Sequence, residues 1–115
     1  MASVIRGSDN FDSAGGAAMK AWVNFDGTGT VAIRAQYNVS SITDLNTGSY
    51  RVNFTTAMPD ANYSAVCTGL WTGGPYTAVP GTSSSYLTTS LSVVTGTTTS
   101  GAGVDLAAIN VAIFR

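Results

Sequence analysis

Few side chains in this chain could carry out acid–base, nucleophilic or metal chemistry. The 115 residues include no histidine, and all 6 acidic residues are aspartates. Without histidine the chain lacks the commonest general base and a common metal ligand. Asp9 and Asp12 lie close together, but the segment 8–12 has too few oxygen ligands for a calcium loop. We therefore expect no catalytic residues, no metal site, no cofactor and no enzymatic activity.

Two further features look reactive but have structural explanations. Cys67 is the single cysteine, so it cannot form an intrachain disulfide, and no basic residue near it in sequence would activate its thiol. We interpret it as a small core residue of a strand. Gly27-Thr28-Gly29 lies between two strand-like runs, with no helix following that could hold a phosphate. The pattern favours a hairpin turn, in which Gly27 supplies the positive φ that such turns need.

Aromatic residues beside glycine- and proline-rich segments are the candidates for binding. Trp71 and Tyr86 flank a long loop expected over residues 72–85, and Tyr76 lies within it between two glycine- and proline-rich segments. Aromatic side chains on loops can stack on sugar rings or anchor a protein contact. The competing interpretation is that Trp71 ends a strand and closes the core. We keep all three residues as candidates for receptor binding.

Apolar residues alternate with polar ones in three runs near the start of the chain. A period of two places each set on one face of a sheet. Turn sequences at Asp26-Gly27 and at residues 45–48 separate the runs. The pattern predicts a three-stranded antiparallel meander with one buried face, in which residues 40–44 extend the second strand past a bulge or bend. The expected inward residues are Ala21, Val23 and Phe25, then Val31, Ile33, Ala35, Tyr37 and Val39, then Tyr50, Val52 and Phe54.

Further strands are predicted over 63–71, 85–94 and 105–115, with a crossover at 56–62 and a loop at 95–103. In the strand over 85–94, Leu87, Leu91 and Val93 share one face. The last strand is apolar on both faces, which is typical of a central strand or a subunit interface. Its inward residues are Ala107, Ile109, Val111 and Ile113. We predict an oligomer interface on the opposite face, formed by Trp22, Leu106, Ala108 and Phe114.

Short strands with turns every 8–12 residues are typical of antiparallel sandwiches. We predict an all-β fold, an antiparallel β-sandwich or jelly-roll-like domain of about six to eight strands. Residues 19–115 form this domain, and residues 1–18 are an N-terminal arm or edge strand.

The low charge of the chain predicts assembly. Charged residues make up 10% of the sequence, against about 25% in a typical soluble domain. A surface with so little charge favours an oligomer, in which part of that surface is buried, over a monomer. The net charge of −1 and the scattered Lys and Arg residues exclude nucleic-acid binding. No apolar run approaches the ~20 residues of a membrane span, so we expect no membrane insertion.

Residues 20–63 resemble a known group of proteins. The matching segments are KAWVNFDGTGTVAIRAQYNVSSITD, YRVNFT at 50–55 and AMPDANY at 57–63. They are similar to small β domains of fibre and related virion proteins of tailed bacteriophages, particularly phages of aquatic bacteria. The resemblance implies compact β domains, often trimers about a fibre axis, that contact other virion proteins.

The expected function is therefore that of a virion structural protein, assembled in the host cytoplasm. In the first hypothesis a tail-fibre-type domain oligomerises as a homotrimer and binds a host surface glycan or protein. In the alternative it is a capsid decoration or cement protein. A stand-alone carbohydrate-binding module is the third hypothesis.

Overall fold

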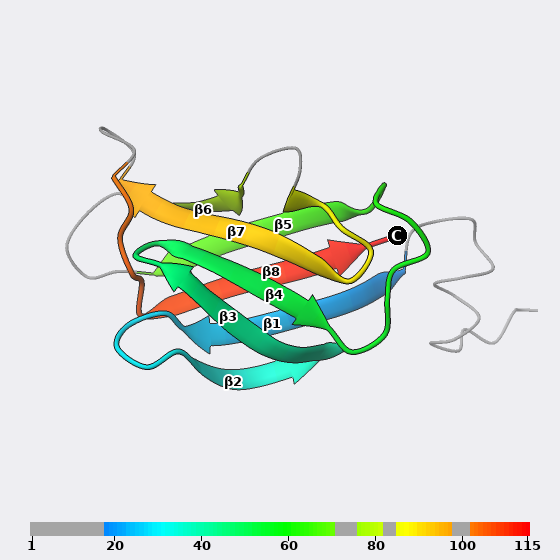
Figure 1. Ribbon diagram of the computed structural model, residues 1–115, viewed down its shortest axis with the longest axis horizontal. Helices are drawn as coiled ribbons and strands as arrows, with labels where there is room; N and C mark the ends of the chain where they lie inside the picture. The colour runs from blue at the N-terminus through cyan, green and yellow to red at the C-terminus, as the bar shows by residue number, and fades with distance from the viewer. Residues whose placement is uncertain (1–17, 71–75, 82–84, 98–101) are drawn as a thin grey trace, which may run out of the picture.

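Two four-stranded antiparallel sheets pack face to face in the computed structural model (Figure 1). The structure describes residues 18–70, 76–81, 85–97 and 102–115. Sheet A has the strand order β2-β1-β8-β5 and sheet B the order β3-β4-β7-β6. This confirms the predicted all-β sandwich. The strands are β1 Met19–Asp26, β2 Ala32–Tyr37, β3 Val39–Asn46, β4 Ser49–Phe54, β5 Ser64–Leu70, β6 Tyr76–Pro80, β7 Ser90–Thr97 and β8 Ala108–Phe114.

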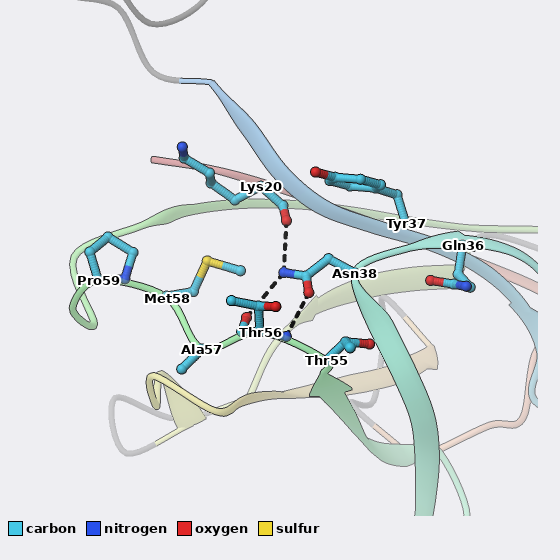
Figure 2. A pocket seen from close by; sticks show the side chains of 9 residues that line it. All are labelled: Lys20, Gln36, Tyr37, Asn38, Thr55, Thr56, Ala57, Met58 and Pro59. Atoms are coloured by element: carbon cyan, nitrogen blue, oxygen red, sulfur yellow. Dashed lines mark hydrogen bonds between the residues drawn. The ribbon is translucent and has the colours of Figure 1, made fainter. Parts of the chain in front are cut away.

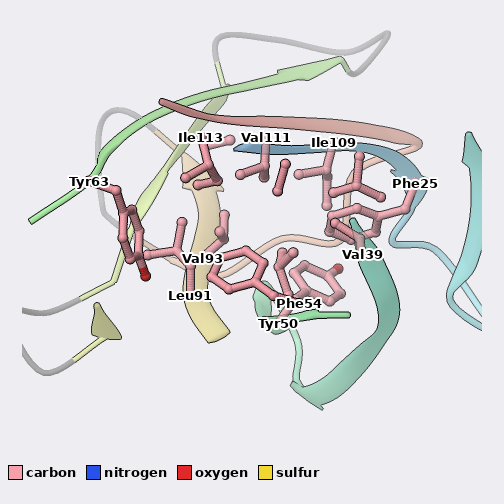
Figure 3. Close-up of a cluster of buried hydrophobic side chains, with 14 of the residues drawn as sticks. Phe25, Val39, Tyr50, Phe54, Tyr63, Leu91, Val93, Ile109, Val111 and Ile113 are labelled. Carbon is pink, nitrogen blue, oxygen red and sulfur yellow. The ribbon is translucent and has the colours of Figure 1, made fainter. Parts of the chain in front are cut away.

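Alternating apolar residues from both sheets fill the space between them (Figure 3). Burial of each such side chain contributes about 1.5–3 kcal/mol, so these strands supply the main stabilisation of the sandwich. Strand β8 lies between β1 and β5, which confirms the central position, one of the two alternatives predicted for it. The side chains from these strands that are at most 2% exposed are Ala21, Val23, Phe25, Ile109, Val111 and Ile113 in sheet A, and Tyr50, Val52, Leu91 and Val93 in sheet B.

The predicted three-stranded meander is wrong, because the second run divides between the two sheets. Asn38 adopts a left-handed conformation with φ of 57°, which asparagine tolerates better than most residues. Before it, β2 pairs with β1 in sheet A. After it, β3 pairs with β4 in sheet B. The bend expected after Val39 thus lies at Asn38 and carries the chain from one sheet to the other.

The inward face predicted for residues 31–39 is also wrong in part. The register between β1 and β2 shifts between Asn24 and Phe25. Asn24 pairs with Ala35, but Phe25 pairs with Ile33, so β2 contains one extra residue between the two pairs. One extra residue in a strand reverses the face on which the following side chains lie. Ala35 is therefore exposed, and the Tyr37 side chain is 56% exposed. Val39 is buried as predicted.

Two predicted boundaries change in the second half of the chain. The loop expected over 72–85 contains strand β6, whose pairing with β7 runs from Tyr76↔Thr97 to Pro80↔Val93. Pro80 is tolerated there because β6 is an edge strand. Strand β7 begins at Ser90, so Leu87 precedes it and is 49% exposed instead of buried. Because β7 continues to Thr97, the first residues of the loop predicted over 95–103 belong to a strand.

A buried tyrosine connects the two sheets. Tyr50 of β4 crosses the core, and its ring meets the Phe25 ring edge-to-face with 5.3 Å between centroids. Its hydroxyl lies 3.0 Å from the Gly27 carbonyl oxygen and 2.6 Å from Oδ1 of Asp105, and it can donate to either. The same Asp105 oxygen accepts a hydrogen bond from the Gly48 N–H at 2.8 Å. Burial, and then the neighbouring Asp105, raise the pKa of Tyr50, so the hydroxyl remains a donor.

Glycine is required at position 27 because a side chain there would clash with its neighbours, and not because the backbone is left-handed. The expectation of positive φ at Gly27 is wrong, since Gly29 and Gly48 are the described glycines with positive φ. A Cβ at Gly27 would lie 2.5 Å from the Tyr50 hydroxyl oxygen and 2.8 Å from Cδ1 of Ile109. Both neighbours belong to the core and have little room to move.

Replacing Gly27 by alanine should therefore destabilise the fold by about 1–3 kcal/mol, the usual range for overpacking a core. The added methyl group displaces the Tyr50 hydroxyl from its acceptors. Denaturant unfolding, followed by tryptophan fluorescence, measures this change in the free energy of unfolding.

Gly29→Asn is the matched control. Its φ is 57°, no atom lies within 4 Å of a Cβ placed there, and asparagine tolerates this conformation. The control should unfold close to wild type. Equal stability of Gly27→Ala and Gly29→Asn would contradict the close approach at Gly27.

Candidate binding surfaces

The structure does not gather the predicted receptor-binding aromatics into one site. Trp71 lies outside the described residues. Tyr76 begins β6, and its partly buried side chain packs against the core. Tyr86 is also partly buried, with its ring centroid 5.1 Å from that of Tyr63. Tyr76 pairs with Thr97 at the end of β7, whereas Tyr86 pairs with Leu91 near its start, so the two lie at opposite ends of this strand.

Residues 55–63, which we call the crossover, link β4 of sheet B to β5 of sheet A across one end of the sandwich (Figure 1). Two buried side chains anchor this segment, Met58 and Tyr63. The Met58 N–H donates to the Thr88 carbonyl oxygen at 2.8 Å. The Tyr63 hydroxyl lies 2.9 Å from the carbonyl oxygen of Leu87, to which it can donate. These contacts anchor the crossover to the segment before β7. The crossover predicted at 56–62 and the strand predicted at 63–71 lie here, the strand as β5 Ser64–Leu70.

An ion pair fixes the middle of the crossover to the C-terminal residue. Arg115 donates from Nη2 to Oδ2 of Asp60 at 2.7 Å and from Nε to Oδ1 at 3.0 Å. The hydrogen bond from Arg115, followed by one from the Asn62 N–H, lowers the pKa of Asp60 to about 2. Such two-point pairing of arginine with a carboxylate restricts both side chains to one geometry.

A pocket of about 760 Å³ lies between the crossover and the end of β2 (Figure 2). The Asn38 side chain joins its walls: Nδ2 donates to the carbonyl oxygens of Lys20 and Thr56, and Oδ1 accepts from the Thr56 N–H at 2.7 Å. We call this hollow the Tyr37 pocket. Its lining residues are Lys20, Gln36, Tyr37, Asn38, Thr55, Thr56, Ala57, Met58 and Pro59.

A second pocket, of about 720 Å³, borders the other part of the crossover. Tyr63 and Tyr86 line it, together with Ala61, Asn62, Ser64 and Ala65. Tyr86 is thus one predicted binding residue that does lie beside a pocket. Tyr37, which lines the larger one, was missed because the strand alternation placed it in the core. The signal that could have revealed it is the asparagine that follows it, a residue type that tolerates the left-handed bend.

The outer face of sheet A carries an exposed apolar surface. Trp22 and Val66 lie on either side of Ala112 in the strand register. They line a shallow groove of about 420 Å³ together with Met19. We call Met19, Trp22, Val66 and Ala112 the apolar face. Of the predicted interface residues, Trp22 and Phe114 are partly buried, and Phe114 pairs with Met19 on the same strands.

Leu106 does not belong to this face, contrary to the prediction. Its side chain is fully buried and contacts the position where Gly69 would carry a Cβ. Strand β8 begins only at Ala108, so the alternation of the strand does not extend back to Leu106. Ala108 is partly buried and pairs with Leu70 at the start of the strand.

A row of polar side chains crosses sheet A beside the apolar face. Asn24 of β1 donates through Nδ2 to Oδ1 of Asn110 in β8. Asn110 in turn donates to the Thr68 hydroxyl of β5 at 3.1 Å. Arg34 of β2 reaches the same row, with Nη1 3.5 Å from Oδ1 of Asn24. The outer face therefore combines apolar contact area with a directional polar pattern.

The described residues show little reactive chemistry. Within ranges 18–70, 76–81, 85–97 and 102–115 no group of three or more Cys or Asp residues is placed to hold a metal ion. Cys67 packs against the core, and burial raises the pKa of its thiol to about 11, so it is uncharged at neutral pH. In the same part of the chain no helix is long and apolar enough to cross a membrane.

Comparison with known proteins gives no assignment: no protein-family model, no curated protein and no solved structure matches this chain.

The Asp60–Arg115 pair predicts a pH-dependent stability. The pKa of Asp60 in the folded chain lies below its ordinary value of 3.8, so the unfolded chain binds a proton first. The stabilisation that the ion pair contributes is complete above pH 3.8 and is lost as the pH falls towards about 2. Scanning calorimetry should therefore show that Asp60→Asn lowers the thermal midpoint at neutral pH and that the difference from wild type shrinks over this acid range.

Arg115→Gln should have the same effect, and the double variant should add nothing further, because the two residues act as one pair. A difference between wild type and Asp60→Asn that does not change with pH would contradict this assignment.

Proposed function

We propose that this chain is a structural protein of a tailed-bacteriophage virion, a fibre-type β domain that assembles with copies of itself through the apolar face of sheet A. It has no enzymatic role and presents the crossover end of the sandwich to the host surface. The observation that carries the proposal is the apolar face itself. Val66 is 54% exposed there although it is an aliphatic residue in a regular strand.

A second copy of the chain is the partner that best fits this face. Two charged side chains lie near this face. Arg34 is engaged with Asp26 at 3.6 Å and with the Ala107 carbonyl oxygen, and Lys20 lies between Met19 and Trp22 in β1. The pairing of Arg34 with Asp26 limits charge repulsion between two such faces. With 10% charged residues in the whole chain, surface charge contributes little to keeping copies apart.

The polar row of Asn24, Asn110 and Thr68 supports the same partner. Apolar contacts alone allow faces to slide, whereas hydrogen-bonding groups within an interface favour one register. The row runs across three neighbouring strands and lines the groove itself. The resemblance of residues 20–63 to phage fibre domains adds the expectation of three copies around an axis.

The test is a matched pair of substitutions. Val66 lies on β5 and Val79 on β6, both edge strands, with 54% and 46% exposure. We expect wild type and Val79→Asp to sediment as oligomers, most simply trimers, at micromolar concentration. Val66→Asp should sediment as a folded monomer, because its carboxylate would be buried without a partner in the interface.

A wild-type monomer in sedimentation equilibrium would overturn self-assembly, and an assembled Val66→Asp variant would move the interface to another face. Immunogold labelling of intact particles places the protein on the tail, as proposed, or on the capsid, where the decoration role would replace the fibre role.

A further inference from the structure

We propose that the Tyr37 pocket is a carbohydrate-binding site, in which the ring of a hexose packs on the Tyr37 side chain. A carbohydrate is thus the class of ligand that the host-facing end would bind. This biological role rests on the proposed function. The pocket itself stands on its own geometry, and its test does not require assembly.

The exposure of Tyr37 is the first observation. Its side chain is 56% exposed at the end of β2, at the rim of the pocket (Figure 2). Tyr37 pairs with Trp22 across β1 and β2. Among the described residues the Tyr37 hydroxyl has no hydrogen-bond partner, so this hydroxyl is available to a ligand. Tyrosine offers an apolar face and a polar tip, and the two suit the C–H face and the hydroxyls of a sugar.

The polar lining is the second observation. The Thr55 and Thr56 side chains are exposed in the pocket, and neither hydroxyl has a side-chain hydrogen bond within the described part of the chain. Gln36 lies beside them, held in place because its Oε1 accepts the Val39 N–H at 3.0 Å. Hydroxyl and amide groups, which both donate and accept, match the many hydroxyls of a sugar. Lys20 is the one charged residue among those that line the pocket.

Pre-organisation is the third observation. Asn38 bridges β1 and the crossover through three hydrogen bonds while holding a left-handed backbone. Buried Met58 and the Asp60–Arg115 pair fix the remainder of the crossover. Walls that are already ordered lose little entropy when a ligand binds. A left-handed non-glycine residue held by so many bonds is also typical of functional sites.

The dimensions favour a sugar over larger partners. A volume of about 760 Å³ falls within the ~300–1,000 Å³ of small-molecule sites and holds one or two sugar rings. A protein partner would need a much larger surface, on the order of 800 Å² from each side. The Tyr37 pocket and the groove of the apolar face have no lining residue in common. The two surfaces adjoin, because Tyr37 pairs with Trp22 across β1 and β2.

The experiment uses the full chain and a panel of free sugars: glucose, galactose, mannose, N-acetylglucosamine and N-acetylneuraminic acid. Saturation-transfer NMR detects binding, and titration of backbone amide shifts gives the dissociation constant and the location. We expect at least one sugar to bind and to shift the amides of Tyr37, Thr55 and Thr56.

Three variants test the role of the ring. Tyr37→Ala should weaken binding about tenfold or more, as loss of a central aromatic contact does elsewhere. Tyr37→Phe keeps the ring and should stay within about threefold of wild type, the loss expected for one hydroxyl hydrogen bond. Leu87→Ala removes a comparably exposed side chain outside the pocket and should bind as wild type. Thermal unfolding of each variant checks that the fold is retained.

The outcomes separate this site from the proposed assembly. Binding by no sugar of the panel, wild-type binding by Tyr37→Ala, or shifts confined to another surface would each overturn the site. Sedimentation of the same samples reports assembly independently. Intact oligomers without sugar binding would overturn the carbohydrate site alone, and sugar-binding monomers would overturn the assembly alone.

Discussion

The hydrogen bonds of the Tyr50 hydroxyl are the constraint on which the other parts of this sandwich depend. One side chain from sheet B reaches through the core to the Gly27 carbonyl in the turn after β1 and to Asp105 just before β8. Asp105 then holds the Gly48 N–H in the turn between β3 and β4. Two turns and the segment that leads into β8 are thereby fixed by a single cluster at one end of the molecule, in a core where an unpaired polar group would cost about 1–3 kcal/mol.

Strand alternation predicted the core well and the connections poorly. Phe25, Val52 and Val111 were identified because a period of two needs only local sequence. Tyr37 was misplaced because the register shift after Asn24 reverses the face of β2, and an alternating pattern has no signal for one extra residue. Gly27 was assigned to the right turn for the wrong reason, since what excludes a side chain there is the distant Tyr50.

The binding surfaces also differ in whether local sequence or tertiary contacts determine them. Trp22 was predicted to face outward because its neighbours in β1 face inward, and that argument is local. The Tyr37 pocket depends on Asn38 and the crossover, which lie 18 residues apart in sequence and meet only in the folded chain. Strand β6 was missed because glycine, proline and serine around it are typical of loops, whereas its pairing with β7 is a tertiary contact.

The backbone pairing of Ala18 with Arg115 determines how the domain responds to tension. The Arg115 N–H donates to the Ala18 carbonyl at 3.0 Å, at the point where β1 and β8 begin to run side by side. A force pulling these two residues apart acts across the ladder and opens its hydrogen bonds one after another. A force along β8 would have to break many of them at once. We therefore expect the domain to be mechanically compliant between residues 18 and 115 and stiff along its strands.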